Sequence, residues 1–127
     1  MKSALVLACD DNYVPFTAVV ARRIARLSRG TLPIIVVSDG VSEKNRELAQ
    51  AFCPQIEFVE AKHVLEAQSL PVDEKITRAA HLRLFLDEIL EGYDRAVYLD
   101  SDISPLVDIS PLLGVEPKSA PVAAAYD

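Results

Sequence analysis

The sequence has only two cysteines, fewer basic than acidic residues, and no long apolar run. Cys9 and Cys53 are too few and too isolated for a disulfide framework or a zinc site, so we expect buried thiols in a reducing cytoplasm. A net charge of −6 argues against a nucleic-acid partner, because such proteins carry basic patches. No apolar stretch approaches the roughly 20 residues that are needed to span a bilayer.

Two local features bear on membranes and targeting. The start of the chain superficially resembles a signal peptide, but its apolar core is only about six residues long and runs into Asp10, which indicates a first buried strand. The only basic cluster has the spacing of the solvated face of one helix, and a peripheral contact with the inner face of a membrane stays open as an alternative. This cluster consists of Arg22, Arg23, Arg26 and Arg29.

Apolar runs alternate with segments of helical period, which predicts an α/β fold with a mostly parallel sheet and flanking helices. The 127 residues correspond to one domain, 1–127. Strands are predicted at Ala4–Cys9, Pro33–Val37, Ile56–Val59, Ala96–Leu99 and Val122–Tyr126.

Helices are predicted between these strands. The first starts with Asn12 in its N-cap region and ends near Gly30, and the second runs from Ser42 to about Ala51. The stretch His63–Val72 is expected to be irregular. A third helix is predicted from Asp73 to Gly92, and a turn and a short helical piece lie between Pro105 and Pro111.

Acidic side chains follow three of the predicted strands, and this is the strongest functional signal. Asp10 follows the first strand, Asp100 and Asp102 the fourth, and Asp127 the fifth. Ligands of open α/β sheets bind beyond the carboxyl ends of the strands. Carboxylates crowded at one such edge would repel one another unless a cation or hydrogen bonds compensated, so the pattern favours a metal site.

The segment Asp100-Ser101-Asp102 has a spacing that suits a metal. Beyond a strand, the side chains of Asp100 and Asp102 leave on the same side, roughly 6.6 Å apart along the chain, while Ser101 points away. Two such carboxylates can bind one hard divalent cation, which could neutralise a diphosphate. The alternative is an acidic turn that caps the next element, since Asp and Ser are common turn residues.

Three segments together resemble glycosyltransferase family 8: Ala8-Cys9-Asp10-Asp11-Asn12-Tyr13, then 77–84 with Arg83, then Val97-Tyr98-Leu99-Asp100-Ser101-Asp102. The phrase Ser38-Asp39-Gly40-Val41-Ser42 is also similar to the family pattern. The resemblance implies a GT-A (Rossmann-like) fold, a UDP-sugar donor, Mn²⁺ (or Mg²⁺) and retention of anomeric configuration. It points to galactosyl- and glucosyltransferases of bacterial lipopolysaccharide and capsule synthesis.

The resemblance covers essentially the whole chain, but the chain matches only about the first half of a typical family domain. The late histidine segment that completes the metal site in the family has no counterpart here. The resemblance therefore implies the truncated, donor-binding half of the enzyme, and activity of this chain alone is not implied. His63 and His81 are not expected to be metal ligands.

The resemblance also implies roles for single residues. The nucleotide-sugar contacts would be Asp10, Asn12, Tyr13, Lys75, Arg83, Asp100 and Ser101, with Tyr13 stacking on the uracil. Asp100 and Asp102 would bind the metal, and Asp127 would contact the transferred sugar. Structural alternatives stay open: Tyr13 could pack at a helix start, Arg83 could form an ion pair, and Asp10 or Asn12 could cap the first helix.

The predicted function is metal-dependent hexosyl transfer from a UDP-sugar to a saccharide or glycolipid acceptor, with self-association left open. One alternative is a non-catalytic nucleotide-sugar-binding remnant of the same fold. A second is a haloacid-dehalogenase-type phosphatase, whose first motif also places D-x-D after an apolar strand. That motif normally lies near the start of the chain and continues differently, whereas here three strands precede it and Ile103-Ser104-Pro105 follows.

Overall fold

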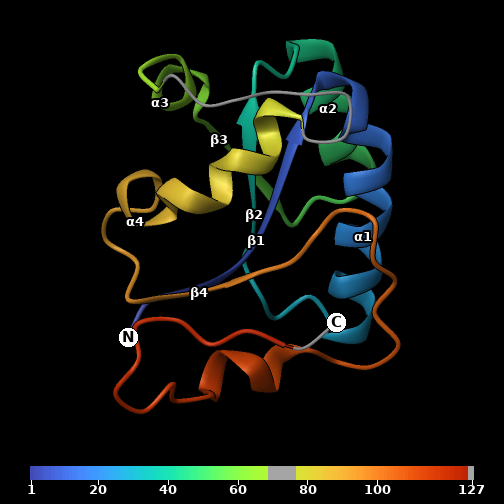
Figure 1. The fold of residues 1–127 in the computed structure, drawn as a ribbon. Coiled ribbons are helices and arrows are strands. Elements are labelled where there is room, and N and C mark those ends of the chain that lie inside the picture. Colours follow the sequence, from blue (N-terminus) through green and yellow to red (C-terminus); the bar gives the residue numbers. More distant parts are fainter. Residues whose placement is uncertain (69–76, 126–127) are drawn as a thin grey trace.

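The computed structural model describes residues 1–68 and 77–125, which form a four-stranded parallel sheet between two layers of helices (Figure 1). The strands lie in the order β3-β2-β1-β4, and each neighbouring pair is parallel. Their bounds are β1 (Ser3–Asp10), β2 (Ile34–Asp39), β3 (Ile56–Glu60) and β4 (Arg95–Tyr98). The four corresponding strand predictions agree to within two residues, and the predicted α/β fold with a parallel sheet is confirmed.

One face of the sheet is covered by α1 (Val14–Leu27) and α2 (Glu43–Phe52). The short 3₁₀-helix η1 (Asp11–Tyr13) precedes α1, and Ser42 precedes α2. Pro15 lies in the first turn of α1, where a backbone donor would have no helical partner. Ser42 Oγ accepts a hydrogen bond from the Asn45 amide and caps α2 as expected. Cys9 and Cys53 are free and buried in this layer, as predicted.

The opposite face is covered by α3 (Lys62–Glu66), η2 (Arg78–Phe85) and α4 (Leu86–Ile89). In β1, Leu5 and Leu7 face the first layer, while Ala4 and Val6 face the second. A strand buried on both faces needs apolar residues at every position, which explains the unbroken apolar run of β1.

The helix predicted from Asp73 to Gly92 is wrong in detail, because the described part consists of the 3₁₀-helix η2 followed by α4. Residues 73–76 lie outside the described residues. A 3₁₀-helix repeats every three residues, so Ala79, Leu82 and Phe85 lie on one side and pack on the sheet. The prediction put Leu82, Leu86 and Ile89 on one apolar stripe, and all three pack on this face of the sheet, but η2 does not have the predicted α-helical period.

Two further predictions need correction. The short helix α3 overlaps the start of the stretch predicted to be irregular, and it buries Val64 and Leu65, of which Leu65 belongs to the core on this face of the sheet. Val122–Ala125, the described part of the predicted fifth strand, is not a strand, and Val122 is largely exposed. After β4 the described chain forms η3 (Ser110–Gly114), with Pro111 in its first turn, and it adds no further strand to the sheet.

None of the helices among the described residues has the length and apolar character that crossing a bilayer requires.

Candidate functional site

All four strands deliver a carboxylate to the same edge of the sheet. Asp10, Asp39 and Glu60 end β1, β2 and β3, and Asp100 lies two residues after the end of β4. Because the strands are parallel, their carboxyl ends meet at one edge, where ligands of such sheets bind. Asp10 and Asp39 are direct partners in the register of β1 and β2.

The turn from Asp100 to Asp102 is attached to the sheet by its middle residue. Ser101 is buried, and its hydroxyl donates a hydrogen bond of 3.1 Å to the backbone carbonyl of Ala8 in β1. Asp100 and Asp102 on either side are exposed. The carboxylates therefore lie on the solvent side of a turn that β1 fixes in place, close to the end of that strand at Asp10.

Tyr98, the last residue of β4, lies among three of the predicted site residues. Burial raises the pKa of its hydroxyl to about 12, and the negative charges of Asp100 and Asp102 act in the same direction. The positive charge of Arg83 acts against this shift, which puts Arg83 within electrostatic range of the same hydroxyl. Arg83 on η2 and the two carboxylates after β4 thus act on the same hydroxyl, although these segments are separate in the sequence.

Asn12 and Tyr13 lie on η1, directly beyond β1. Asp10 Oδ1 accepts a hydrogen bond of 3.0 Å from the Tyr13 amide, so Asp10 rather than Asn12 caps this turn. Both Asn12 and Tyr13 are exposed, and the Tyr13 ring centroid is 4.9 Å from that of Phe16. The Tyr13 ring therefore has one aromatic neighbour and enough exposed surface to contact a flat ligand.

Asp11 fixes this turn from the other side, a role that sequence reasoning did not assign. Its Oδ1 accepts hydrogen bonds of 2.8 Å from the Ser42 amide and from Asn45 Nδ2. These bonds hold the pKa of the Asp11 carboxyl below its usual value. The start of α2 thus supports the turn that presents Asn12 and Tyr13.

Asp39 and Glu60 have partners within the chain, and both were missed as members of this edge. Asp39 accepts two hydrogen bonds, of 2.9 and 2.5 Å, from the guanidinium of Arg78. Glu60 accepts bonds from Ser38, from the amides of Gly40 and Lys62, and from Arg46 at 2.8 Å. The available signal was the position of each acid at the end of a predicted strand.

The remaining acids, Asp100 and Asp102, could contribute to a metal site. In the described part of the chain neither forms a salt bridge, and both are exposed oxygen donors of the kind that hard divalent cations prefer. Within residues 1–68 and 77–125, no group of three or more His, Cys, Asp or Glu side chains could bind a metal ion together. The two carboxylates fit a cation whose other ligands come from elsewhere, such as a diphosphate.

Two residues of the predicted site, Lys75 and Asp127, lie outside the described residues. His63 is on α3 and His81 on η2. Asp10, Asn12, Tyr13, Arg83, Asp100, Ser101 and Asp102 all lie on segments that reach the carboxyl edge of the sheet or flank it.

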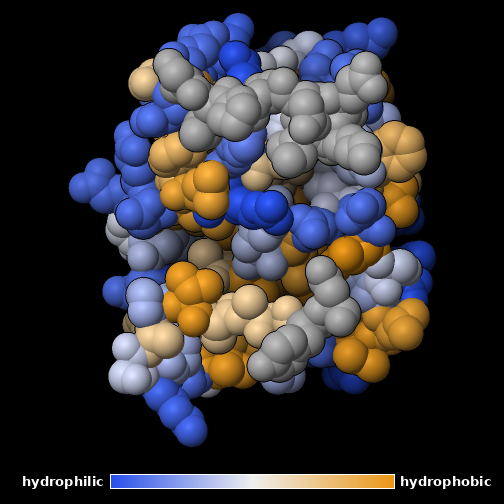
Figure 2. Space-filling view, viewed as in Figure 1, coloured by the Kyte–Doolittle hydropathy of each residue, from blue (hydrophilic) through white to orange (hydrophobic). Residues whose placement is uncertain are grey.

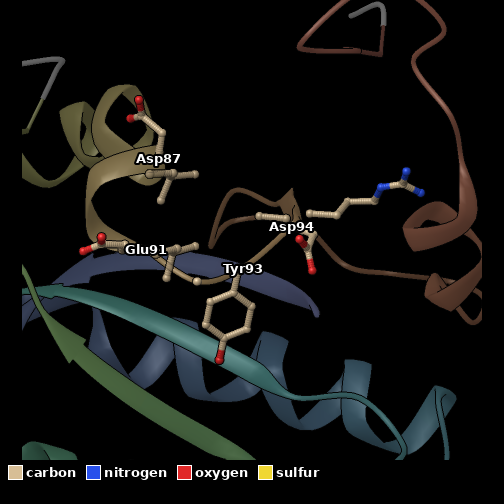
Figure 3. Close-up of a pocket in the computed structure, with 9 residues that line it drawn as sticks. Asp87, Glu91, Tyr93 and Asp94 are labelled. Carbon is tan, nitrogen blue, oxygen red and sulfur yellow. The ribbon is translucent and has the colours of Figure 1, made fainter. Parts of the chain in front are cut away.

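Two hollows in the described surface lie away from this edge. One, of about 370 Å³, is formed by the segment from Leu86 to Ala96, around the start of β4 (Figure 3). Asp87, Glu91, Tyr93 and Asp94 line it, and the Asp94 carboxylate accepts a hydrogen bond from the Lys2 amide. It therefore lies by the amino end of β4, so the strand ends rather than this hollow indicate the ligand site.

The family model described as "Glycosyl transferase family 8" matches residues 4–127. The solved structure of galactosyltransferase LgtC in complex with donor and acceptor sugar analogues is similar, with a TM-score of 0.78 and 27% identity. A structure of an active-site mutant of LgtC gives the same values.

The match to LgtC covers 89% of this chain but only 42% of LgtC. The apo structure of WbbM, a bifunctional glycosyltransferase, has a TM-score of 0.67 and 22% identity, over 91% of this chain and 21% of that protein. This second likeness shows the fold alone. Among curated proteins, none matches the chain.

Proposed function

The chain belongs to glycosyl transferase family 8, and on that premise we propose that it forms the donor-binding part of a retaining hexosyltransferase. The proposed donor is a UDP-sugar, the proposed metal is Mn²⁺ or Mg²⁺, and the proposed acceptor is a saccharide or glycolipid. Membership in glycosyl transferase family 8 argues against the haloacid-dehalogenase alternative, although haloacid-dehalogenase-type phosphatases also have a D-x-D motif.

The observation that carries this proposal is the cluster of separate segments at the carboxyl edge. The Asp100–Asp102 turn is fixed to β1 by Ser101, Arg83 lies near it, and the exposed Tyr13 lies beyond the same strand. Carboxylates, a guanidinium and an aromatic ring are the groups that a metal, a diphosphate and a base would each require.

Each residue would act on a different part of the donor. Tyr13 would stack on the uracil, and Asp10 and Asn12 would contact the uridine. Arg83 would contact the diphosphate and sugar region, because a guanidinium binds phosphate oxygens through paired donors. Ser101 would keep the turn in place through its bond to Ala8, which is a positioning role.

Asp100 and Asp102 would bind the metal, and Asp100 would also lie near the ribose. When bound, a divalent cation supplies Lewis acidity that stabilises charge on the leaving diphosphate. Mn²⁺ suits this ligand set, since carboxylates and phosphate oxygens are the donors it prefers. We extend the proposal to Lys75 as a donor contact and to Asp127 as a contact of the transferred sugar.

The proposed place in metabolism is lipopolysaccharide or capsule synthesis in the cytoplasm, at the inner face of a membrane. The two free, buried cysteines fit a reducing compartment. LgtC was solved with donor and acceptor sugar analogues, which supports a donor and an acceptor sugar as substrates for this chain. The sugar proposed for transfer is galactose or glucose.

Calorimetric titration with UDP, with and without Mn²⁺, tests this function. We expect Mn²⁺ to tighten UDP binding to the natural chain, because two carboxylates leave metal positions that phosphate oxygens can fill. Asp102→Asn should remove this Mn²⁺ dependence, whereas Asp87→Asn, an equal charge change on α4, should leave it intact. UDP affinity that does not change with Mn²⁺, or an equal Mn²⁺ dependence of UDP affinity in Asp102→Asn, would contradict the proposed site.

A transfer assay separates the enzyme from its binding-only alternative. Product formation from UDP-galactose or UDP-glucose by the natural protein would support the hexosyltransferase. Tight, Mn²⁺-dependent UDP binding by a natural protein that forms no sugar product would instead favour the non-catalytic nucleotide-sugar-binding module.

A further inference from the structure

The outward face of α1 combines exposed apolar side chains with arginines. Phe16 and Val19 are each 58% exposed, and Arg23 and Arg26 are exposed as well. Side chains three or four residues apart lie on the same side of an α-helix, so these four form one stripe along α1. Figure 2 shows hydrophobic surface along the side of the molecule where α1 and the chain after β4 lie.

A shallow groove beside this stripe continues the same chemistry onto the end of α2. It has a volume of about 480 Å³, and its lining contains three arginines and no carboxylate. The guanidinium of Arg22 lies over the ring of Phe52, 4.4 Å from its centroid. We define the α1 face as Phe16, Val19, Arg22, Arg23, Arg26 and Phe52.

The charge of this face is opposite to that of the chain as a whole. Residues 14–29 contain four arginines and no acid, in a chain whose net charge is −6. Among the described residues, the cations that form salt bridges lie elsewhere, namely Arg46, Lys62, Arg78 and Arg95. Arg23 instead donates a hydrogen bond to the backbone carbonyl of Pro105, so its charge is not neutralised by a carboxylate.

We propose that the α1 face docks onto the anionic headgroups of a membrane surface. A helix that lies flat on such a surface uses arginines to contact lipid phosphates and aromatic or aliphatic side chains to enter the headgroup boundary. A second copy of the chain fits less well, because pairing two α1 faces would bring like charges together. The net negative charge of the chain disfavours nucleic acid as the occupant.

The docking proposal rests on the α1 face and gives the proposed membrane location a surface of contact, and one further consequence rests on the proposed function. Phe16 begins the stripe and its ring contacts that of Tyr13 at the carboxyl edge of the sheet. A docked α1 face would therefore place the edge proposed to bind the donor next to the headgroups. An acceptor carried on a lipid would then meet the donor at the membrane surface.

Co-sedimentation of the 127-residue chain with vesicles tests the proposal. We expect binding to vesicles of equal parts phosphatidylcholine and phosphatidylglycerol, weakened by added salt, and little binding to phosphatidylcholine alone. Arg23→Gln with Arg26→Gln should weaken binding about 30-fold, from roughly fivefold for each arginine near the surface. Phe16→Ser with Val19→Ser should also weaken vesicle binding, and changing the salt concentration should not recover the binding that this variant loses.

Matched variants separate the face from general charge and from misfolding. Lys44→Gln with Lys62→Gln removes the same charge outside the α1 face and should bind like the natural chain. Arg23→Lys with Arg26→Lys keeps the charge and should retain most of the binding. Equal binding to both vesicle types, an unaffected Arg-to-Gln variant, or sedimentation of the chain without vesicles would each overturn the proposal.

Discussion

Replacement of Arg78 by Met should destabilise the protein through the carboxylate that it leaves behind. The side chain of Asp39 is only 7% exposed, and Arg78 donates to both of its oxygens, at 2.9 and 2.5 Å. Without Arg78 the charge of Asp39 would be buried at the end of β2 with no cation beside it. Removal of one partner from a buried, charged hydrogen-bonded pair costs more than the pair itself contributes.

The size of the effect follows from the unequal exposure of the two partners. Hydrogen bonds to charged groups contribute about 1.5–3 kcal/mol, but Arg78 is 39% exposed, so solvent screens part of its charge. We therefore expect a loss of about 2 kcal/mol in the free energy of unfolding. With an unfolding entropy of roughly 2 cal/mol/K per residue over 127 residues, this corresponds to a fall of about 8 °C in Tm.

Thermal and urea unfolding followed by circular dichroism would measure this loss. Lys62→Met is the matched control, because the Lys62–Glu66 pair is about half exposed on both sides and should contribute less than about 0.5 kcal/mol. Adding Asp39→Asn to Arg78→Met should recover part of the loss, since the unpaired charge is then gone. Equal stabilities of Arg78→Met and Lys62→Met, or no recovery in the double variant, would refute the reasoning.

Three further predictions follow from single side chains. Tyr13→Ala should weaken UDP binding by about 1–3 kcal/mol without changing its Mn²⁺ dependence, because the ring would meet the base; calorimetry with unchanged UDP affinity would make Tyr13 structural. Glu60 is partly buried, which raises its pKa, but hydrogen bonds from Gly40, Lys62 and Ser38 and the charge of Arg46 outweigh this and lower it. Because the pKa is lower in the folded state, ionised Glu60 adds to the free energy of unfolding above pH 4.5, its ordinary pKa. This contribution is lost as the pH falls through the folded-state pKa. Glu60→Gln should therefore flatten the acid side of a curve of unfolding free energy against pH. Burial raises the pKa of Cys9 to about 12, so at neutral pH it should react with an alkylating reagent only as fast as the protein opens; rapid labelling of the native chain would contradict this.

The sheet could be predicted from sequence because β1 and β2 are buried on both faces. Leu5, Val6, Ile35 and Val36 form parts of unbroken β-prone runs, and turn residues such as Gly40 end them. The supposed fifth strand at Val122 had similar composition, yet the described part of it does not join the sheet. Strand propensity shows that a segment fits a sheet but does not supply the neighbouring edge.

The arrangement of the carboxyl edge could be predicted only in part. Alternation and strand ends were enough to put Asp10 and Asp100 at the same edge. Sequence could not show that Arg78 would pair with Asp39, because the two residues are 39 positions apart and meet only when η2 folds back over the sheet. For the same reason, the proximity of Arg83 to Tyr98 required the structure.

A crystal structure with UDP and Mn²⁺ bound, using anomalous scattering from manganese, tests the central claim most directly. We predict one manganese peak in contact with the carboxylates of both Asp100 and Asp102, with oxygens of the UDP diphosphate completing its ligands and the uracil against Tyr13. UDP bound away from the carboxyl edge of the sheet, or manganese bound without either of these two carboxylates, would contradict the proposed site.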